Sequence, residues 1–308
     1  MVELYENRVW IDGCFDFTHH GHSGAILQAR RTIPKDQRDG SLLICGVHND
    51  ADIEHHKGGK PVIHEQERYY HTESNKWCDQ VVKDAPYVTE PEVLDSYGCK
   101  YVVHGDDITT DANGEDCYQQ MKDNGRFKVV KRTEGVSTTE IIDRILRNVP
   151  QTNQQKASVD RELLTMYSTD KSGYEPWSWV FGQNFEDVIV EGTGSVSDQN
   201  WVVVEEPDGF DLFNVGHIQE LQKWKEAGKR VCCSMYTDKD VFMTLEERTL
   251  SVLSCNVVDG VLLYPVSRDT TTAKTITTSL KDNIIQRINH DRDHYIERNI
   301  KKGITYEN

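Results

Sequence analysis

The chain has 308 residues, 37% of them hydrophobic, and a mean hydropathy of −0.64, which is typical of a polar-surfaced globular protein made of one large or two ordinary domains. With 51 acidic and 35 basic residues its net charge is −16, which repels nucleic acid and anionic lipid, so neither is an expected partner. The eight cysteines fit no zinc spacing, so we expect reduced thiols. Neither a signal peptide nor an apolar stretch of about 18 residues is found, so we expect no membrane anchor and a cytoplasmic location.

A histidine-rich turn follows the first apolar run. Residues 9–11 are typical of a buried strand, and residues 23–31 have the apolar spacing of a helix. Between them lie the glycine turn GCFD at 13–16 and the sequence HHGH at 19–22. Backbone N–H groups and the positive end of the helix dipole favour an anion at such a point, and imidazoles can donate hydrogen bonds to phosphate oxygens. We therefore predict a phosphate site here.

Strands and helices alternate through the rest of the first 147 residues, which predicts a doubly wound parallel sheet. The expected strands are 41–48, 80–82, 101–103 and 127–131, and the expected helices are 65–77, 91–97, 117–124 and 140–147. We interpret the polar stretch 49–61 as a loop. There Lys57, followed by two glycines, is able to fold over a triphosphate; a solvated surface lysine is the alternative.

Two further turns carry polar groups at strand ends. Asp106 and Asp107 follow the strand at 101–103, where they are suited to an ammonium group or a metal-bound phosphate, or to capping a helix. Residues 132–139, RTEGVSTT, place an arginine and three hydroxyls at the start of the helix at 140–147. An ordinary cap explains one hydroxyl but not three beside an arginine, so this segment favours phosphate.

Together these segments resemble the HxGH nucleotidylyltransferases and, within them, the CTP:phosphoethanolamine cytidylyltransferase family. The resemblance covers nearly all of residues 8–147 and rests on GCFDFTHHGH, HHKG, QERYY, KWCDQVVKDAPYV, VVHGDDIT and KRTEGVSTTEII. It implies transfer of the cytidylyl group of CTP to phosphoethanolamine, with Mg²⁺ accompanying CTP. Choline relatives tend to have tryptophan at the position of Tyr87 and a long basic helix that this chain lacks. Phosphocholine or another phospho-alcohol as acceptor, and a non-catalytic nucleotide-binding regulator, are the alternatives.

The resemblance also implies the site residues. The expected catalytic residues are His19, His22, Lys57 and Arg132. The expected nucleotide-binding residues are Gly13, Cys14, Phe15, Asp16, Gly21, Ser137, Thr138 and Thr139. Lys57, Tyr87 and Asp106 are expected to bind the acceptor, and no residue is expected to bind a metal directly.

The second half repeats this pattern in eroded form. Sliding GFDLFNVGH by 195 positions places Asp211 on Asp16 and His217 on His22, but Asn214 on His19. Further along, the spacing between matching positions of the two halves falls from 188 to 180 residues. The second half therefore lacks eight residues there, among them the counterpart of Lys57. At residues 270–272 the offset is 133, so another 47 residues are missing.

We therefore interpret the chain as two tandem Rossmann-like α/β domains with parallel sheets, the second reduced. Residues 1–147 form the catalytic domain, 148–198 a partly packed linker, and 199–308 a degenerate, non-catalytic copy. For the copy, a purely structural role is slightly favoured over an anion held at His217 and 270–272. We expect the two domains to pair within the chain, and the sequence leaves open whether chains associate further.

Overall fold

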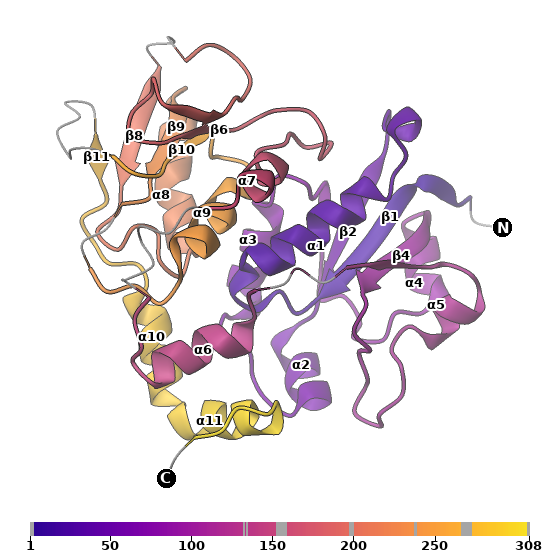
Figure 1. Cartoon of the computed structure of the whole chain (residues 1–308). Helices are drawn as coiled ribbons and strands as arrows, with labels where there is room; N and C mark the ends of the chain where they lie inside the picture. Colours follow the sequence, from indigo (N-terminus) through magenta and orange to yellow (C-terminus); the bar gives the residue numbers. More distant parts are fainter. Residues whose placement is uncertain are drawn as a thin grey trace. The chain divides into compact units, whose positions relative to one another are not determined.

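The computed structural model describes residues 3–131, 133, 135–151, 159–196, 200–236, 239–265 and 273–306. The chain divides into two compact units (Figure 1). Unit 1 comprises residues 1–135 with 171–173, and unit 2 comprises 136–170 with 174–308. The expected domain boundaries at 147 and 198 stay predictions.

Unit 1 is built on a parallel five-stranded sheet in the order β3-β2-β1-β4-β5. Its strands are β1 (Tyr5–Gly13), β2 (Leu42–Val47), β3 (Gln80–Lys83), β4 (Cys99–Gly105) and β5 (Phe127–Val130). Its helices are η1 (Asp16–Thr18), α1 (His20–Arg31), η2 (Lys35–Gln37), α2 (Asp50–Lys57), α3 (Glu65–Glu73), α4 (Pro91–Ser96) and α5 (Gln119–Asp123). The predicted doubly wound parallel sheet is confirmed, with β1 at its centre.

The core of unit 1 forms around the central strand. The buried indole of Trp10 on β1 lies in a cluster with Leu94 of α4 and Met121 of α5. The adjacent Val9 points to the other face of the sheet, and α1 packs against β1. Gly46 on β2 makes room for the indole, because a Cβ there would lie 2.4 Å from Cζ2 of Trp10.

Residues 50–57 form the helix α2, so the expected loop at 49–61 was wrong. Asn49 caps the helix by accepting the N–H of Asp52 at 2.6 Å, and Gly58 ends it in the left-handed conformation (φ 67°). The first turn is acidic and the last is basic, which suits the helix dipole. Only Ile53 is buried, so the helix has no apolar stripe for a periodicity analysis to detect. Lys57 is therefore the last residue of a helix.

Unit 2 contains a six-stranded sheet in the order β11-β8-β9-β10-β6-β7. Its strands are β6 (Trp179–Phe181), β7 (Val188–Val190), β8 (Trp201–Glu205), β9 (Arg230–Ser234), β10 (Gly260–Leu262) and β11 (Lys274–Thr275). The pairs are parallel except that β7 runs antiparallel to β6, so this second sheet is mixed. Both β6 and β7 come from the apolar segments of the expected linker.

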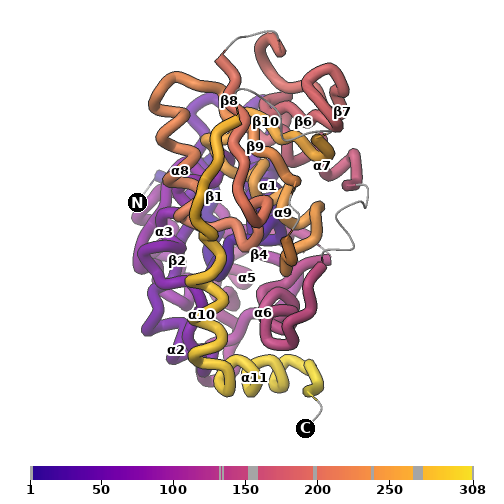
Figure 2. Tube along the Cα trace, turned by 90° about the vertical axis from the view of Figure 1, so that its left-hand side faces the viewer, coloured from indigo at the N-terminus to yellow at the C-terminus, as the bar shows by residue number. Residues whose placement is uncertain are grey.

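Six helices of unit 2 are α6 (Thr138–Leu146), α7 (Arg161–Tyr167), α8 (Val215–Glu226), α9 (Leu245–Leu253), α10 (Asp282–His290) and α11 (Arg292–Lys301). Helix α6 lies against α10 and α11 (Figures 1 and 2). The guanidinium of Arg144 donates to both carboxylate oxygens of Glu247 at 2.7 and 3.0 Å. Asn299 Nδ2 donates to the carbonyl oxygen of Thr139 at 3.4 Å. The helix that follows RTEGVST is thus held by the last helices of the chain.

Candidate functional site

The turn between β1 and α1 is strained. Phe15, Phe17 and Thr18 have φ values of 49°, 66° and 40°, in the left-handed region that non-glycine residues seldom adopt. Such strain persists only where surrounding contacts over-determine the backbone, and it gathers at functional sites. Gly13, predicted to open this turn, is the last residue of β1.

Two buried side chains hold this turn in place. The carboxylate of Asp16 accepts the backbone N–H groups of Val62 at 3.1 Å and Ile63 at 3.0 Å. The guanidinium of Arg68 donates to the carbonyl oxygens of Cys14 at 2.7 Å and Ile63 at 3.0 Å, and to a carboxylate in the first turn of α2 at 2.8 Å. Hydrogen bonds therefore connect the turn to the segment after α2.

The two predicted catalytic imidazoles lie side by side at the start of α1. His19 is the N-cap residue, and its Nδ1 accepts the N–H of Gly21 at 3.1 Å. A neutral imidazole that accepts at Nδ1 carries its proton on Nε2, which leaves Nε2 as the donor. The ring of His22, in the first turn, stacks on that of His19 with centroids 4.0 Å apart and 20° between the planes. This arrangement presents imidazoles and helix N–H groups at one place.

Tyr87 follows β3 and forms a buried aromatic platform. The ring of His56 stacks on it with centroids 4.3 Å apart and 7° between the planes, and that of His48 lies tilted at 5.0 Å. The Nζ of Lys57 is 5.9 Å from the Tyr87 centroid. Burial raises the pKa of the Tyr87 hydroxyl, so it stays protonated. Lys57 is exposed and forms no salt bridge with any residue that the structure describes.

Asp12 is the residue that the sequence analysis missed. It lies next to the end of β1 and is 3% exposed. Its carboxylate accepts Trp10 Nε1–H at 2.6 Å and the hydroxyls of Thr89 and Tyr118. Within the described ranges no cation pairs with it, which is costly for a buried carboxylate. The available signal was an aspartate at the end of a buried strand, directly before the glycine turn.

The ring of His48 lies within electrostatic range of both Asp12 and Lys57. Burial is the main cause that lowers the pKa of His48; Asp12 opposes that shift, and Lys57 adds to it. Its Nδ1 is 3.0 Å from the carbonyl oxygen of Ala85, an arrangement in which Nδ1 carries the proton. A neutral imidazole thus lies near an anion and a cation, neither of which forms an ion pair with a described residue.

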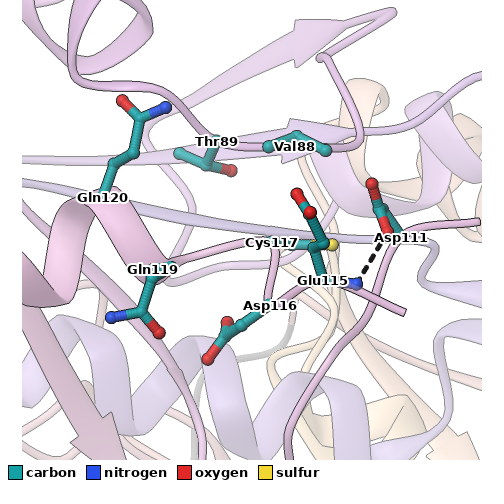
Figure 3. Close-up of a pocket in the computed structure, with 8 residues that line it drawn as sticks. All are labelled: Val88, Thr89, Asp111, Glu115, Asp116, Cys117, Gln119 and Gln120. Atoms are coloured by element: carbon teal, nitrogen blue, oxygen red, sulfur yellow. Dashed lines mark hydrogen bonds between the residues drawn. The ribbon is translucent and has the colours of Figure 1, made fainter. Parts of the chain in front are cut away.

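A cavity of about 440 Å³ opens beside Thr89. Figure 3 shows that the carboxyl-bearing residues Asp111, Glu115 and Asp116 line it together with Cys117. Backbone N–H groups of residues 113 and 115 bind Asp111 and lower the pKa of its carboxyl. Asp106, predicted to bind the acceptor, lies instead in an exposed turn after β4 and does not line this cavity.

The predicted phosphate-binding hydroxyls belong to unit 2. Ser137 is the N-cap residue of α6 and accepts the N–H of Glu140 at 3.1 Å, Thr138 is the first residue of that helix, and Thr139 Oγ1 accepts from Lys302 Nζ at 3.3 Å. Arg132 lies outside the described residues. Convergence of this segment with the histidine turn on one triphosphate stays a prediction.

Unit 2 repeats the scaffold of the turn. Phe210 and Leu212 have φ values of 61° and 49°. Asp211 accepts the two consecutive backbone N–H groups of 242–243, both at 2.9 Å. The fully buried Arg248 donates to carbonyl oxygens of the turn and of the neighbouring strand end. The copy therefore has the same backbone strain as the first turn, the same aspartate that accepts two backbone N–H groups, and the same buried arginine that donates to carbonyl oxygens.

The turn in unit 2 is covered by residues 279–281. A Cβ on Gly216 would lie 3.3 Å from Cδ2 of Leu280. The buried Nζ of Lys281 lies 3.3 Å from carboxylate oxygens of both Asp208 and Asp211. These contacts favour the structural role for the copy. Residues 270–272, the other half of the weighed anion site, lie outside the described residues.

Among the described residues, no helix is both long and apolar enough to cross a membrane. The same residues contain no group of three or more His, Cys, Asp or Glu side chains placed to hold a metal ion.

Comparison with known proteins gives consistent results. Residues 10–144 match the cytidylyltransferase-like family. The chain is 46% identical to the ethanolamine-phosphate cytidylyltransferase of Saccharomyces cerevisiae over 99% of both chains. It is 36% identical to the Mus musculus protein of the same name, over 83% of this chain and 70% of that one. Choline-phosphate cytidylyltransferase A of Mus musculus is 35% identical over 53% of this chain and 44% of its own.

The extent of these matches separates the two groups of relatives. The likeness to the ethanolamine-phosphate proteins continues into unit 2, whereas the match to the choline-phosphate protein covers about half of the chain. The histidine turn and the segment that follows it lie within residues 10–144, the range that matches the cytidylyltransferase-like family. The chain belongs to the ethanolamine-phosphate cytidylyltransferase family.

Proposed function

We propose that the protein transfers the cytidylyl group of CTP to phosphoethanolamine, giving CDP-ethanolamine and pyrophosphate, for phosphatidylethanolamine synthesis. The names of its relatives support this reaction. The structural observation that carries it is the pair of unbalanced charges near Tyr87, namely the buried carboxylate of Asp12 and the exposed ammonium of Lys57. Phosphoethanolamine carries an ammonium group and a phosphate separated by two carbons. Asp12 receives the ammonium, and Lys57 binds the phosphate.

In this proposal an oxygen of the acceptor phosphate attacks the α-phosphorus of CTP in line. A new P–O bond forms as the bond to the β-phosphate breaks, and pyrophosphate leaves. His19 Nε2 and the ring of His22 donate hydrogen bonds to oxygens on which negative charge grows. Positioning and charge stabilisation suffice, so no covalent enzyme intermediate is needed. Mg²⁺ enters as part of the CTP complex.

The remaining predicted site residues have two kinds of role. We propose that Asp16 shapes the turn, because backbone N–H groups bind both of its carboxylate oxygens. Backbone groups of the turn and of the start of α1 then approach the triphosphate closely. The residues proposed to bind nucleotide phosphates or line their path are Gly13, Cys14, Phe15, Gly21, Arg132, Ser137, Thr138 and Thr139.

The chemistry near Asp12 favours a primary ammonium over a quaternary one. A primary ammonium donates N–H groups, for which Asp12 and the hydroxyl oxygens of Thr89 and Tyr118 are suitable acceptors. A trimethylammonium group has no N–H and depends on open aromatic faces. One face of Tyr87 is already covered by His56. A cytoplasmic location and pairing of the two domains within the chain stay predictions.

Pyrophosphate release by the purified protein with CTP and Mg²⁺ tests the proposal, with phosphoethanolamine and phosphocholine offered in parallel. We expect a strong preference for phosphoethanolamine. Asp12→Asn should raise KM for phosphoethanolamine at least about tenfold and leave KM for CTP within about threefold, since a buried charge-assisted contact is lost. Asp106→Asn, in the exposed turn, is the comparison variant.

Each alternative has its own outcome in this assay. Equal use of both acceptors would contradict the acceptor assignment. No release with any phospho-alcohol would contradict the activity and favour a nucleotide-binding regulator. A larger effect of Asp106→Asn than of Asp12→Asn would move the ammonium site to the turn after β4.

A further inference from the structure

We infer that His56 is a positioning residue that fixes the last turn of α2 and thereby the ammonium group of Lys57. The inference rests on the proposed function, in which Lys57 binds phosphate. It assigns a role to a side chain that lies beside the site and has no part in the proposed chemical step.

His56 is held by contacts from two separate segments. Its ring stacks nearly parallel on the buried ring of Tyr87, with 7° between the planes. Its Nδ1 accepts the backbone N–H of Ala112 at 3.1 Å. The stacking fixes the plane of the imidazole, and the hydrogen bond fixes its rotation within that plane. Tyr87 belongs to a buried hydrophobic cluster of unit 1, so this platform is rigid.

Helix α2 needs such an anchor at its end. It has only eight residues, and Ile53 is the single one that is buried. Isolated helices of this length are marginal, and their last turns fray without tertiary contacts. Gly58 then takes the left-handed conformation, which ends the helix directly after Lys57. Without the contacts of His56, the backbone that carries Lys57 would be free to move away from Tyr87.

Lys57 itself has little else to hold it. Its Nζ lies over the ring of Tyr87 at 5.9 Å, and it forms no salt bridge in the described part of the chain. A lysine side chain is a flexible four-carbon stem, so its ammonium is placed by its backbone and by its ligand. An imprecision of about 1 Å in a positioned group can cost about 10²-fold in rate. Fixing the helix end is therefore of direct use to the reaction.

His55 provides a matched control on the same turn of the helix. Its side chain is exposed and meets His56 edge-on, with centroids 4.8 Å apart. Replacing either histidine by alanine removes the same group from adjacent positions. Only the change at His56 removes the contacts with Tyr87 and Ala112.

The test is a double-mutant cycle measured as kcat and KM for phosphoethanolamine and CTP. His56→Ala should lower kcat/KM for phosphoethanolamine about 10- to 100-fold and leave KM for CTP within about threefold. His56→Phe keeps a ring on Tyr87 and should recover most of the loss. His55→Ala should stay within about twofold of the unchanged protein. Adding His56→Ala to Lys57→Ala should cause no further loss, because His56 acts through Lys57.

The outcomes separate this inference from the proposed function. Normal kinetics of His56→Ala beside a severe defect of Lys57→Ala would overturn the inference and leave the proposed function intact. Additive losses in the double variant would also overturn it, since His56 would then act independently of Lys57. Near-normal kinetics of Lys57→Ala would overturn the proposed role of Lys57 and this inference with it. If His56→Ala fails to fold, His56→Leu supplies the same cycle, because leucine fills the space but can neither stack on Tyr87 nor accept the N–H of Ala112.

Discussion

The turn before α1 in unit 1 and the turn before α8 in unit 2 share a scaffold and differ in what they present to a ligand. Asp16 and Asp211 each accept two consecutive backbone N–H groups, and Arg68 and Arg248 are both fully buried and donate to carbonyl oxygens of their turns. The imidazole of His19, however, has no counterpart, because Asn214 occupies its position. The comparison teaches that the parts of the motif that hold its shape are separable from the parts that meet a substrate.

The N-cap position shows this separation most directly. His19 accepts the N–H of Gly21 at 3.1 Å, and Asn214 accepts that of Gly216 at 2.9 Å. Asparagine is among the best N-cap residues, so the helix start survives the change. What is lost is the imidazole Nε2, a donor that the capping role does not use.

The charges near the two turns differ in a second way. In each unit an aspartate directly precedes a glycine of the turn, Asp12 in unit 1 and Asp208 in unit 2. Asp12 has neutral donors and no cation among the described residues, whereas Asp208 lies 3.3 Å from the Nζ of Lys281. We interpret the first carboxylate as ready for an ammonium ligand and the second as neutralised by the chain itself.

The largest effect is expected where the internal cation of unit 2 is removed. Lys281→Ala leaves Asp208 and Asp211 buried without it, and breaking a buried pair on one side costs about 3–5 kcal/mol. Lys239→Ala, whose Nζ is 3.9 Å from Asp208 and whose side chain is 52% exposed, should cost less than about 1 kcal/mol. Urea unfolding followed by tryptophan fluorescence measures both. Equal losses would contradict the special role of Lys281.

Removing the equivalent histidines should affect activity only in unit 1. His22→Ala should lower kcat by about 10²–10³, the usual effect of losing one preorganised donor. His217→Ala, fully buried on α8, should reduce stability but change kcat per folded molecule less than about twofold. Pyrophosphate release, normalised to the folded fraction, checks the pair. A large loss of kcat in the folded His217→Ala protein would show that the copy takes part in catalysis.

A smaller effect is expected at Glu206. When the two halves are aligned with an offset of 195 residues, this acidic residue occupies the position of the apolar Ile11. Burial raises the pKa of Glu206 to about 7 from its usual 4.5. The folded state therefore binds the proton more tightly than the unfolded chain, so the stabilising effect is complete below about pH 4.5 and is lost as the pH rises through 7. Glu206→Gln should remove this loss, at most about 3 kcal/mol.

Urea midpoints at several pH values between 4.5 and 8 check the prediction for Glu206. The exposed Glu226→Gln variant on α8 should keep the pH dependence of the unchanged protein. An unaltered pH dependence in Glu206→Gln would mean that this carboxyl does not cause the loss of stability between pH 4.5 and 8.

The smallest effect is expected from restoring the missing imidazole. Asn214→His in the His22→Ala background should recover no measurable activity, because Leu280 and Lys281 still cover the turn. Isothermal titration with CTP should likewise give one site per chain before and after the change. Two CTP sites, or recovered pyrophosphate release, would show that the covering residues can be displaced.

The sequence was sufficient for the features that local patterns encode. Apolar runs such as residues 9–11 predicted the parallel strands, and the spacing of the histidines placed His19 and His22 at the start of a helix. The repeat in the second half followed from the shared FD and GH pairs. These features depend on residues close together in the chain.

What the sequence did not reveal depends on distant contacts or weak periodicity. Asp12 gains significance only through Thr89 and Tyr118, which lie 77 and 106 positions away. Helix α2 buries a single apolar residue, so its caps and charges, not its periodicity, define it. No pattern near Lys281 indicates the turn that it meets some 70 positions earlier.

The packing of α6 suggests why an eroded copy persists. The helix that carries Thr138 and Thr139 is tied to the end of the chain, where Asn299 binds the carbonyl oxygen of Thr139 and Arg292 that of Leu146. Selection can therefore act on the copy as a support for α6, independently of any chemistry at the turn before α8. Among members of the family, substitutions should be rarer at Arg292 and Asn299 than at Asn214, because any residue that is a good helix N-cap can replace Asn214. We interpret the second copy of the fold as a scaffold that holds α6 in place.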